Sequence, residues 1–288
     1  ALSENGEIDA EHLLQHADLA MYKAKQSGRN TFRLFTEDME QTVRQRFKLE
    51  VALPDAIAKN QFFLHYQPKA DCHSGEIIGF EALLRWQHPE YGLIPPGDFI
   101  PIIDEDNLVI EIGEWVLNEV CRQLAQWRQQ GLPVLPVAVN ISGHHLHSPS
   151  LLPCVKQTLN AHAIESELIE IEITEGVLTS NTEHSIAVMN ALKTLGIKLS
   201  VDDFGTGYSS LSYLKNFPID ILKIDQTFVR DAASNIEDGA ICKAIISLAK
   251  SLDLQIIAEG VETQEQLAFL QQHDCHSYQG YLFNRPLP

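Results

Sequence analysis

The sequence predicts an α/β fold, with a closed (β/α)8 TIM-like barrel as the first choice and a doubly wound open sheet as the alternative. Eight short runs rich in Val, Ile and Leu alternate with longer amphipathic segments, and this alternation is typical of βα units. Several of these runs are almost entirely apolar, which is expected when both faces of a strand are covered. The 288 residues suffice for one large barrel or for two small domains.

The residues before the first predicted strand are expected to be helical. One apolar helix face is formed by Leu13, Leu14, Ala17, Leu19, Ala20 and Met21. Residues 27–30 (Ser-Gly-Arg-Asn) are a plausible helix stop. A second helical segment runs from about Val43 to Asn60, and Pro54 is expected to bend it or to begin a new turn.

From residue 62 onwards, strands and helices are expected to alternate. The predicted strands are 62–67, 77–86, 137–140, 169–174, 198–202, 221–225, 255–259 and 277–281. The helices expected between them include 111–130, 151–163, 182–195, 236–252 and 263–272.

Charged and amide side chains lie in or directly after these apolar strands, mostly near the carboxyl ends, where core packing alone would not select them. They are Glu81, Asn140, Glu172, Asp202, Asp203, Lys223 and Glu259. In a closed barrel the carboxyl ends of the parallel strands meet at one face, so these residues are expected to share one pocket. A buried charge is unfavourable unless it is paired or bound to a metal.

The composition of this predicted pocket indicates a hard divalent metal. Oxygen donors without His or Cys favour Mg²⁺ or Mn²⁺, with Ca²⁺ as a non-productive competitor. The adjacent Asp202 and Asp203 suit a two-metal site, in which one carboxylate bridges and the other serves the second ion. Two such ions about 3.5–4 Å apart can activate a water and stabilise the leaving oxygen of a phosphodiester.

Each of these residues also has a purely structural interpretation when it is taken alone. Glu81 and Glu259 could be salt-bridge partners, and Lys223 could merely neutralise a neighbouring acid. Asn140 could cap a helix or form a turn, and the pair Asp202-Asp203 could cap the following helix. Because all of these interpretations would have to hold at once, the shared pocket is favoured.

A glycine-containing loop at 203–210 (Asp-Phe-Gly-Thr-Gly-Tyr-Ser-Ser) begins at this acidic pair. Its two glycines allow either a phosphate-binding nest or a mobile lid whose position sets whether Asp202 and Asp203 face the metals. Glu175 follows Glu172 closely and could hold the loop by accepting its backbone N–H groups.

The charge balance argues against DNA or RNA as a partner. The chain has 21 Lys and Arg against 39 Asp and Glu, a formal net charge of −18, whereas nucleic-acid binding needs clustered basic residues. A phosphorylated ligand would therefore need something other than the bulk charge to hold it, and a divalent metal is the obvious candidate.

The remaining sequence features concern the compartment. The five cysteines are scattered without a C-x-x-C pair, which favours reduced thiols over a disulfide framework or a zinc site. The chain contains no apolar run that could span a bilayer and does not open with a signal peptide. We expect a cytoplasmic domain from a longer protein, which could carry a membrane anchor elsewhere.

Seven motifs in this order resemble the signature of EAL-domain cyclic di-GMP phosphodiesterases, over about 43–288. They are Glu81-Ala82-Leu83, Asn140-Ile141-Ser142, Glu172-Ile173-Thr174-Glu175, the loop from Asp202 to Ser210, Lys223-Ile224-Asp225, Glu259-Gly260-Val261-Glu262-Thr263 and Gln279-Gly280-Tyr281. The resemblance implies a (β/α)8 barrel with an irregular, antiparallel first strand, here assigned to 51–288. It also implies hydrolysis of cyclic di-GMP to linear pGpG.

The same resemblance implies a role for each matched residue. The first metal would be held by Glu81, Asn140, Glu172 and Asp202, and the second by Asp202 and Asp203. Lys223 would orient and polarise the attacking water, and Glu259 and Gln279 would support metal-bound waters. Arg85 and Gln67 would contact the phosphate and guanine of the ligand. Glu175 would anchor the loop and support a homodimer formed through the segment after it.

A second resemblance concerns the start of the chain. Residues 16–25 (His-Ala-Asp-Leu-Ala-Met-Tyr-Lys-Ala-Lys) and 28–30 (Gly-Arg-Asn) are similar to the closing helix and turn of GGDEF diguanylate cyclase domains. Residues 1–35 are therefore interpreted as the end of an upstream GGDEF domain and 36–50 as a connecting helix. The motif that names that domain is absent, so no cyclase activity is assigned.

Two other functions and one potential metal cluster complete the interpretation. The chain could be a catalytically weak cyclic di-GMP receptor, or a scaffold that acts through dimerisation. Its full set of matched residues favours the enzyme. His144, His145 and His147 follow Asn140 closely and are interpreted as surface loop residues rather than as metal ligands.

Overall fold

The structure of this protein is a computed structural model that describes residues 9–26, 31–105, 108–179, 182–206 and 214–288. The chain divides into two compact units, Ala1–Gln61 with Gln87–Ile102 and Phe62–Trp86 with Ile103–Pro288. Three sequence predictions lie outside the described residues: the helix stop at 27–30, the loop residues 207–210 and the dimer segment that begins at 211.

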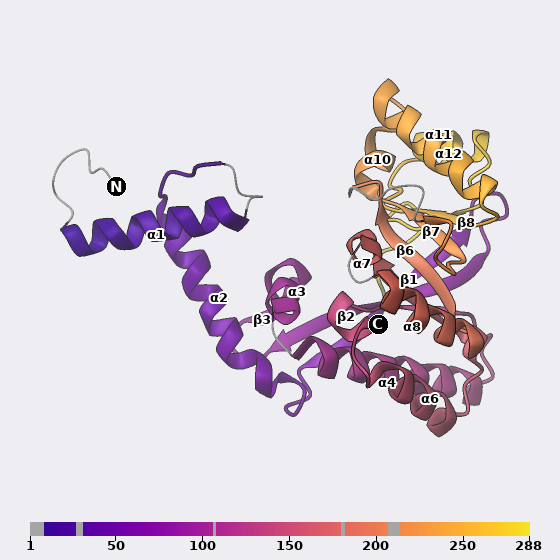
Figure 1. The fold of residues 1–288 in the computed structure, drawn as a ribbon, viewed down its shortest axis with the longest axis horizontal. Coiled ribbons are helices and arrows are strands. Elements are labelled where there is room, and N and C mark those ends of the chain that lie inside the picture. The colour runs from indigo at the N-terminus through magenta and orange to yellow at the C-terminus, as the bar shows by residue number, and fades with distance from the viewer. Residues whose placement is uncertain (1–8, 27–30, 106–107, 180–181, 207–213) are drawn as a thin grey trace. The chain divides into compact units, whose positions relative to one another are not determined.

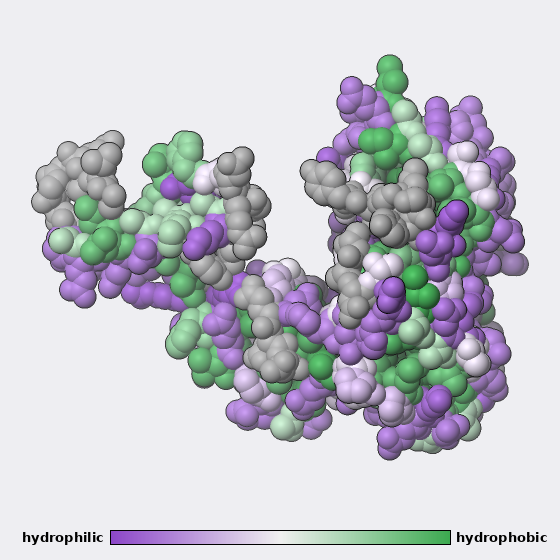
Figure 2. Space-filling view, viewed as in Figure 1, coloured by the Kyte–Doolittle hydropathy of each residue, from purple (hydrophilic) through white to green (hydrophobic). Residues whose placement is uncertain are grey.

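The first unit contains the two helices that precede the barrel, α1 (Ala10–Gln26) and α2 (Glu37–Ala56). Helix α2 begins earlier than predicted and runs through Pro54, ending two residues later, so the missing proline N–H affects only its last turn. Hydrophobic side chains reach the surface of this unit (Figure 2), among them Leu14, Phe32, Leu34 and Phe47.

The second unit is a closed barrel of eight strands, as predicted. The strands are β1 (Phe62–Asp71), β2 (Ile77–His88), β4 (Val137–Asn140), β5 (Ile169–Thr174), β6 (Lys198–Phe204), β7 (Ile221–Ile224), β8 (Gln255–Ala258) and β9 (Ser277–Tyr278). They follow one another in the order β1-β9-β8-β7-β6-β5-β4-β2, and a β1–β2 pairing closes the ring. The short strand β3 (Gly92–Ile94) extends the sheet beyond β2.

The first strand runs against the others. β1 is antiparallel to β2 and to β9, whereas the pairings from β2 through β4 to β9 are parallel. The predicted antiparallel first strand is therefore confirmed. The register places Gln67 of β1 opposite Glu81 of β2, so both side chains lie at the same level of the barrel.

Helices cover the outside of the barrel. They are α4 (Leu108–Gln129), α5 (Gly143–Leu146), α6 (Leu151–His162), α7 (Glu175–Thr179), α8 (Thr182–Thr194), α10 (Gln226–Asp231), α11 (Ile236–Ser251) and α12 (Gln264–Gln272), with a 3-10 turn at Ser166–Leu168. Helix α3 (Pro96–Glu105) begins in the first unit, and its last residues belong to the second. Helices α4 and α6 lie side by side, as do α10 and α11 (Figure 1). None of the helices within the described ranges combines the length and apolarity that a bilayer crossing requires.

The strand sequences explain the barrel wall. All the residues of β5 except its last are buried, and Val137, Ala138 and Val139 of β4 are at most 1% exposed. Burial on both faces explains why β4 is almost wholly apolar, whereas β5 alternates Ile with the buried Glu170 and Glu172. The predicted strand 221–225 is one residue too long, because Asp225 instead caps α10 by accepting the Thr227 N–H. The predicted strand 255–259 also ends one residue earlier, at Ala258.

Candidate active site

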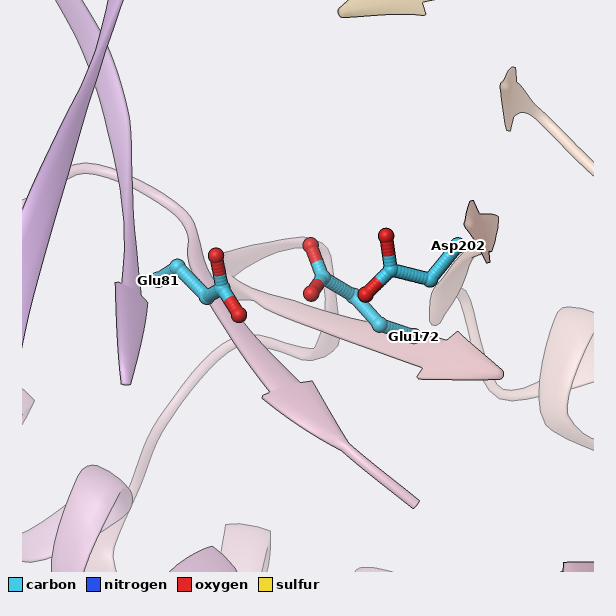
Figure 3. Close-up of side chains that lie close together, drawn as sticks. All are labelled: Glu81, Glu172 and Asp202. Atoms are coloured by element: carbon cyan, nitrogen blue, oxygen red, sulfur yellow. The ribbon is translucent and has the colours of Figure 1, made fainter. Parts of the chain in front are cut away.

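Three carboxylates from three strands converge at the carboxyl ends of the barrel strands. Glu81 of β2, Glu172 of β5 and Asp202 of β6 point toward one another (Figure 3), and each offers an oxygen within 4.8 Å of the others. Asp202, Asp203 and Glu259 form a second group with the same property. The two groups share Asp202, and the structure thus brings together acids that are far apart in sequence.

Lys223 of β7 occupies the middle of this acidic cluster. Its side chain is fully buried, and its Nζ lies 2.8 Å from Glu172 Oε2, 2.6 Å from Glu259 Oε1 and 3.1 Å from Asp202 Oδ1. Glu81 Oε2 is farther away, at 3.7 Å. Lys223 therefore contacts acids from both groups, which is the position that a water-orienting or charge-neutralising group requires.

Amide side chains hold Glu81 on its other sides. Asn140 Nδ2 donates to Glu81 Oε1 over 2.7 Å, and Gln279 Nε2 donates to Glu81 Oε2 over 2.6 Å. Gln279 Nε2 also donates to Gln67 Oε1 over 3.0 Å. The Oε1 atom of Gln279 is buried without a hydrogen-bond partner in the part of the chain that the structure describes. An unpartnered buried acceptor of this kind indicates a donor supplied by a ligand or by bound water.

The clustered acids cannot all be ionised at low energetic cost. Burial and Glu172 raise the pKa of Glu81 to about 6, and burial raises that of Glu259 to about 8 despite the nearby Lys223. Burial would also raise the pKa of Glu172, but the ammonium groups of Lys223 and Lys69 outweigh it and hold the value at about 2. The cluster therefore has more carboxylates than its lysines can neutralise, and bound divalent ions would balance the excess negative charge.

Asp203 adopts a backbone conformation that is unusual for a residue with a side chain. Its φ is 53°, and its N–H donates to Asp202 Oδ1 over 2.9 Å. Burial, the neighbouring Asp202 and a hydrogen bond with Asp225 raise the pKa of Asp203 to about 6. Left-handed backbone at a non-glycine residue is a form of strain that often marks functional sites.

The loop after Asp203 is held by Glu175, the first residue of α7. Glu175 is 4% exposed, and its Oε2 accepts the Gly205 N–H over 2.8 Å. Gly205 has a φ of 100°, and an added Cβ would lie 2.8 Å from the ring of Phe228, so only glycine fits. The structure thus joins Glu175 to the loop that begins at the acidic pair.

Arg85 is the predicted site residue that is least closely tied to the acidic cluster. Its guanidinium is half-buried and donates to the Leu84 carbonyl over 2.9 Å. Burial lowers its pKa, whereas the negative charge of Glu81 opposes that effect. It lies near Glu81 as a basic group without a hydrogen bond to the acids among the contacts described.

One buried lysine was missed by the sequence analysis. Lys69 of β1 is 3% exposed and contacts Glu170 Oε1 at 3.0 Å and Glu172 Oε1 at 2.8 Å. The sequence analysis ended the first strand at Gln67, two residues too early to include it. The residues after Gln67 are Pro-Lys-Ala-Asp, which carry no strand pattern of their own, so the sequence offered no signal for Lys69.

The prediction for the histidines after Asn140 is wrong in one respect. His145 is fully buried in the short helix α5, and its ring lies against Gly113 of α4. His144 is exposed and His147 half-buried. Helix α5 has only four residues, of which His145 and Leu146 are buried. Such a short helix is too brief for a pattern of buried and exposed residues to show in the sequence.

The donor set fits divalent cations. The two acid groups supply only carboxylate oxygens, with the Asn140 and Gln279 amides beside Glu81, and hard ions such as Mg²⁺ and Mn²⁺ prefer such ligands. Glu81, Glu172 and Asp202 would hold one ion, and Asp202, Asp203 and Glu259 surround the place of a second. When bound, such ions would polarise a phosphate and activate a water.

Comparison with known proteins gives the family. The EAL domain family model matches residues 50–286. Cyclic di-GMP phosphodiesterase PdeR of Escherichia coli is 43% identical over 288 residues, which are 100% of this chain and 43% of that protein. The bifunctional diguanylate cyclase/cyclic di-GMP phosphodiesterase MucR of Pseudomonas aeruginosa is 42% identical over 276 residues, 96% of this chain and 40% of that protein.

A solved structure has the same fold. The PaMucR phosphodiesterase in complex with c-di-GMP superposes with a TM-score of 0.80 at 43% identity, covering 84% of this chain and 98% of that one. This chain spans less than half the length of the curated relatives described above. The match over most of the chain, together with the acidic cluster at the barrel's carboxyl face, shows that the chain belongs to the EAL domain family.

Proposed function

We propose that this domain is a divalent-metal-dependent phosphodiesterase that hydrolyses cyclic di-GMP to linear pGpG. The observation that carries the proposal is the pair of oxygen-donor groups that share Asp202 and surround the buried ammonium of Lys223. Two adjoining cation sites can stabilise both the attacking and the leaving oxygen of an in-line displacement at a phosphodiester. The related protein PdeR is a cyclic di-GMP phosphodiesterase, and the similar PaMucR phosphodiesterase was solved in complex with c-di-GMP. Both similarities support the same substrate for this domain.

In the proposed reaction, a water oxygen attacks phosphorus and the bond from phosphorus to the 3′ oxygen breaks, leaving a 5′ phosphate and a 3′ hydroxyl. Lys223 holds and orients the attacking water, since its Nζ lies between the two acid groups. Glu259, 2.6 Å from that Nζ, accepts a hydrogen bond from the same water. Glu81 and Asp203 complete the catalytic set as ligands of the two ions.

The substrate would be recognised beside the acidic cluster. Gln279 donates hydrogen bonds to both Gln67 and Glu81, which fixes the two glutamines at the edge of the acidic cluster. The unpartnered Oε1 of Gln279 would accept a hydrogen bond from bound water or ligand. Arg85 supplies the positive charge that a phosphate of cyclic di-GMP would contact.

The proposal also covers the metal ions, the oligomeric state, the neighbouring domain and the location of the protein. Mg²⁺ or Mn²⁺ would serve at two positions, and Ca²⁺, which accepts looser geometry, would bind without supporting turnover. We propose a homodimer formed near the Glu175-anchored loop, an upstream GGDEF domain of which residues 1–35 are the end, and a cytoplasmic location. The net charge of −18 argues against DNA and RNA as partners.

Chromatographic product analysis tests the activity. Incubation with cyclic di-GMP and Mg²⁺ or Mn²⁺ should yield pGpG, and excess chelator should abolish it. The substitution Glu81→Ala should remove turnover while the barrel remains folded by circular dichroism.

Two other outcomes would replace the proposal. Tight binding of cyclic di-GMP with negligible turnover at saturating Mn²⁺ would indicate a receptor. A protein that neither binds nor hydrolyses the dinucleotide, but forms a dimer in light scattering, would indicate a scaffold.

A further inference from the structure

Lys69 is an enclosed cation that the proposed reaction does not use. It lies on β1, whereas its two partners, Glu170 and Glu172, lie two residues apart on β5 and so on the same face of that strand. In the ring of strands, β2 and β4 separate β1 from β5. The Lys69 side chain therefore reaches across the barrel interior to the carboxylate that is central to the cation site.

Glu172 is held by two lysines, one at each oxygen. Lys69 Nζ lies 2.8 Å from Oε1 and Lys223 Nζ lies 2.8 Å from Oε2, and the Glu172 side chain is fully buried. The terminal torsion of a glutamate is broad and roughly two-fold when nothing restrains it. Contacts at both oxygens fix the plane of the carboxylate and therefore the direction in which it faces Glu81 and Asp202.

Glu170 balances the charge of Lys69 at the far end of this chain of ion pairs. Lys69 and Glu170 line a cavity of about 350 Å³ at the amino ends of the barrel strands, which Lys198 also lines. The ion pairs Glu170–Lys69, Lys69–Glu172 and Glu172–Lys223 thus connect that cavity with the acidic cluster. The cavity has room for water, which can hydrate the polar side chains that replace Lys69 and Glu170 in a variant.

We propose that Lys69 is a positioning residue for the cation site: it holds the Glu172 carboxylate in the orientation in which that group binds a divalent ion, with Glu170 as its counter-charge. The inference rests on the proposed function, because it takes Glu172 as a metal ligand. Partners of metal ligands commonly change metal affinity or activity by about 10- to 100-fold when they are removed. A buried ion pair that only stabilises the barrel would leave metal affinity unchanged.

The double variant Lys69→Met/Glu170→Gln tests this inference, because it removes one positive and one negative charge and keeps side chains of similar size. Mn²⁺ binding is measured by calorimetry without substrate, next to turnover of cyclic di-GMP and thermal unfolding. We expect Mn²⁺ affinity about 10- to 100-fold weaker, with turnover recovering substantially at saturating Mn²⁺. Lys198→Met, a Lys→Met change at the same cavity, should retain the wild-type affinity and turnover.

The outcomes separate the two proposals. Wild-type Mn²⁺ affinity in a folded double variant would overturn the role of Lys69, even if the unfolding temperature falls. A wild-type protein that binds Mn²⁺ without hydrolysing cyclic di-GMP would refute the proposed function and leave the comparison of affinities valid. A wild-type protein that binds no Mn²⁺ would refute both.

A second variant covers failure of the first to fold. Lys69→Gln/Glu170→Gln keeps polar side chains at both positions, but the glutamine is one atom shorter than lysine and carries no charge. It should also weaken Mn²⁺ binding, and an unchanged affinity would overturn the inference.

Discussion

At the scale of single residues, Glu81 shows how a carboxylate is kept in place at a cation site. Asn140 and Gln279 donate to its two oxygens. Glu81→Gln would place an amide N–H against one of these donors and remove one negative charge from the cation site. We expect turnover at saturating Mg²⁺ to fall at least about 100-fold, as for other groups that stabilise the transition state. Steady-state kinetics measure this.

The control for that prediction is Glu76→Gln, an exposed acid just before the same strand, which should keep wild-type turnover. Turnover of Glu81→Gln within threefold of wild type would contradict the assignment of Glu81.

Asp203 combines a functional carboxylate with a strained backbone, and two substitutions separate these properties. Asn tolerates a φ of 53° far better than Ala does. Asp203→Asn should therefore retain stability while losing turnover, whereas Asp203→Ala should lose turnover and also about 1–2 kcal/mol of unfolding free energy. Urea unfolding gives the difference. Equal stability of the two variants would show that the backbone there relaxes.

His145 should make the stability of the protein depend on pH. Burial lowers its pKa below 6.5, although Glu114 opposes the effect, and both ring nitrogens lack hydrogen-bond partners within the described ranges. Below pH 6.5 the unfolded chain takes up the proton and the folded protein resists it. The contribution of His145 to the unfolding free energy should therefore be constant near pH 7.5 and fall by up to about 1.4 kcal/mol per pH unit below 6.5.

Comparison of His145→Leu with wild type isolates this contribution, because burial also lowers the pKa of His65 and His147. Urea unfolding at pH 7.5 and 5.5 should show a smaller loss in the variant. The same loss in both proteins would mean that His145 does not titrate differently on folding.

At the scale of elements, the close approach of α4 and α5 depends on a glycine. A Cβ at Gly113 would lie 2.3 Å from His145 Nδ1, and His145 is too enclosed to move aside. Gly113→Ala gains about 1 kcal/mol of helix propensity but overpacks this contact at about 1–3 kcal/mol, so net destabilisation is expected in urea unfolding.

A matched change tests whether the contact is the cause. Gly97 of α3 has open space around its Cβ position, so Gly97→Ala should leave stability unchanged or raise it by up to about 1 kcal/mol. Destabilisation by both substitutions would indicate a backbone effect and not a clash with His145.

Some elements were predictable from the sequence because their own residues determine them. The strands 137–140 and 169–174 were predicted with their observed bounds, since Val or Ile recurs at alternate positions of each. β1 was cut short at Gln67 because its last residues are strand only through pairing with β2 and β9. Lys69 was lost with them, and no local pattern reveals a contact that crosses the barrel.

The acidic cluster was predictable for a different reason. A parallel barrel gathers the carboxyl ends of its strands, so the topology alone brings Glu81, Glu172 and Asp202 together. The amide contacts of Glu81 and the orientation of Glu172 are set by side-chain packing, which strand patterns do not encode.

At the scale of the whole molecule, cation binding should stabilise the folded protein. An ion that binds only the folded state adds about 2.7 kcal/mol at 100 times its Kd. This corresponds to a rise in unfolding temperature of about 5–10 °C for a domain of this size. Thermal unfolding with Mg²⁺, followed by excess chelator, measures the rise and its reversal.

Glu172→Gln supplies the comparison for that measurement. It removes the charge of a residue that both lysines contact, and the Mg²⁺-dependent rise should shrink or vanish. A full rise in this variant would place the stabilising ions elsewhere.

The pairing of Tyr66 with Leu287 has a practical consequence for protein engineering. The two residues exchange backbone hydrogen bonds, and Gln67 donates to the Asn284 carbonyl, so the final residues of the sequence brace the strand that carries Gln67. A purification tag fused directly after Pro288 would disturb the backbone hydrogen bonds between Leu287 and Tyr66. A flexible spacer after Pro288 keeps Gln67 in its native geometry.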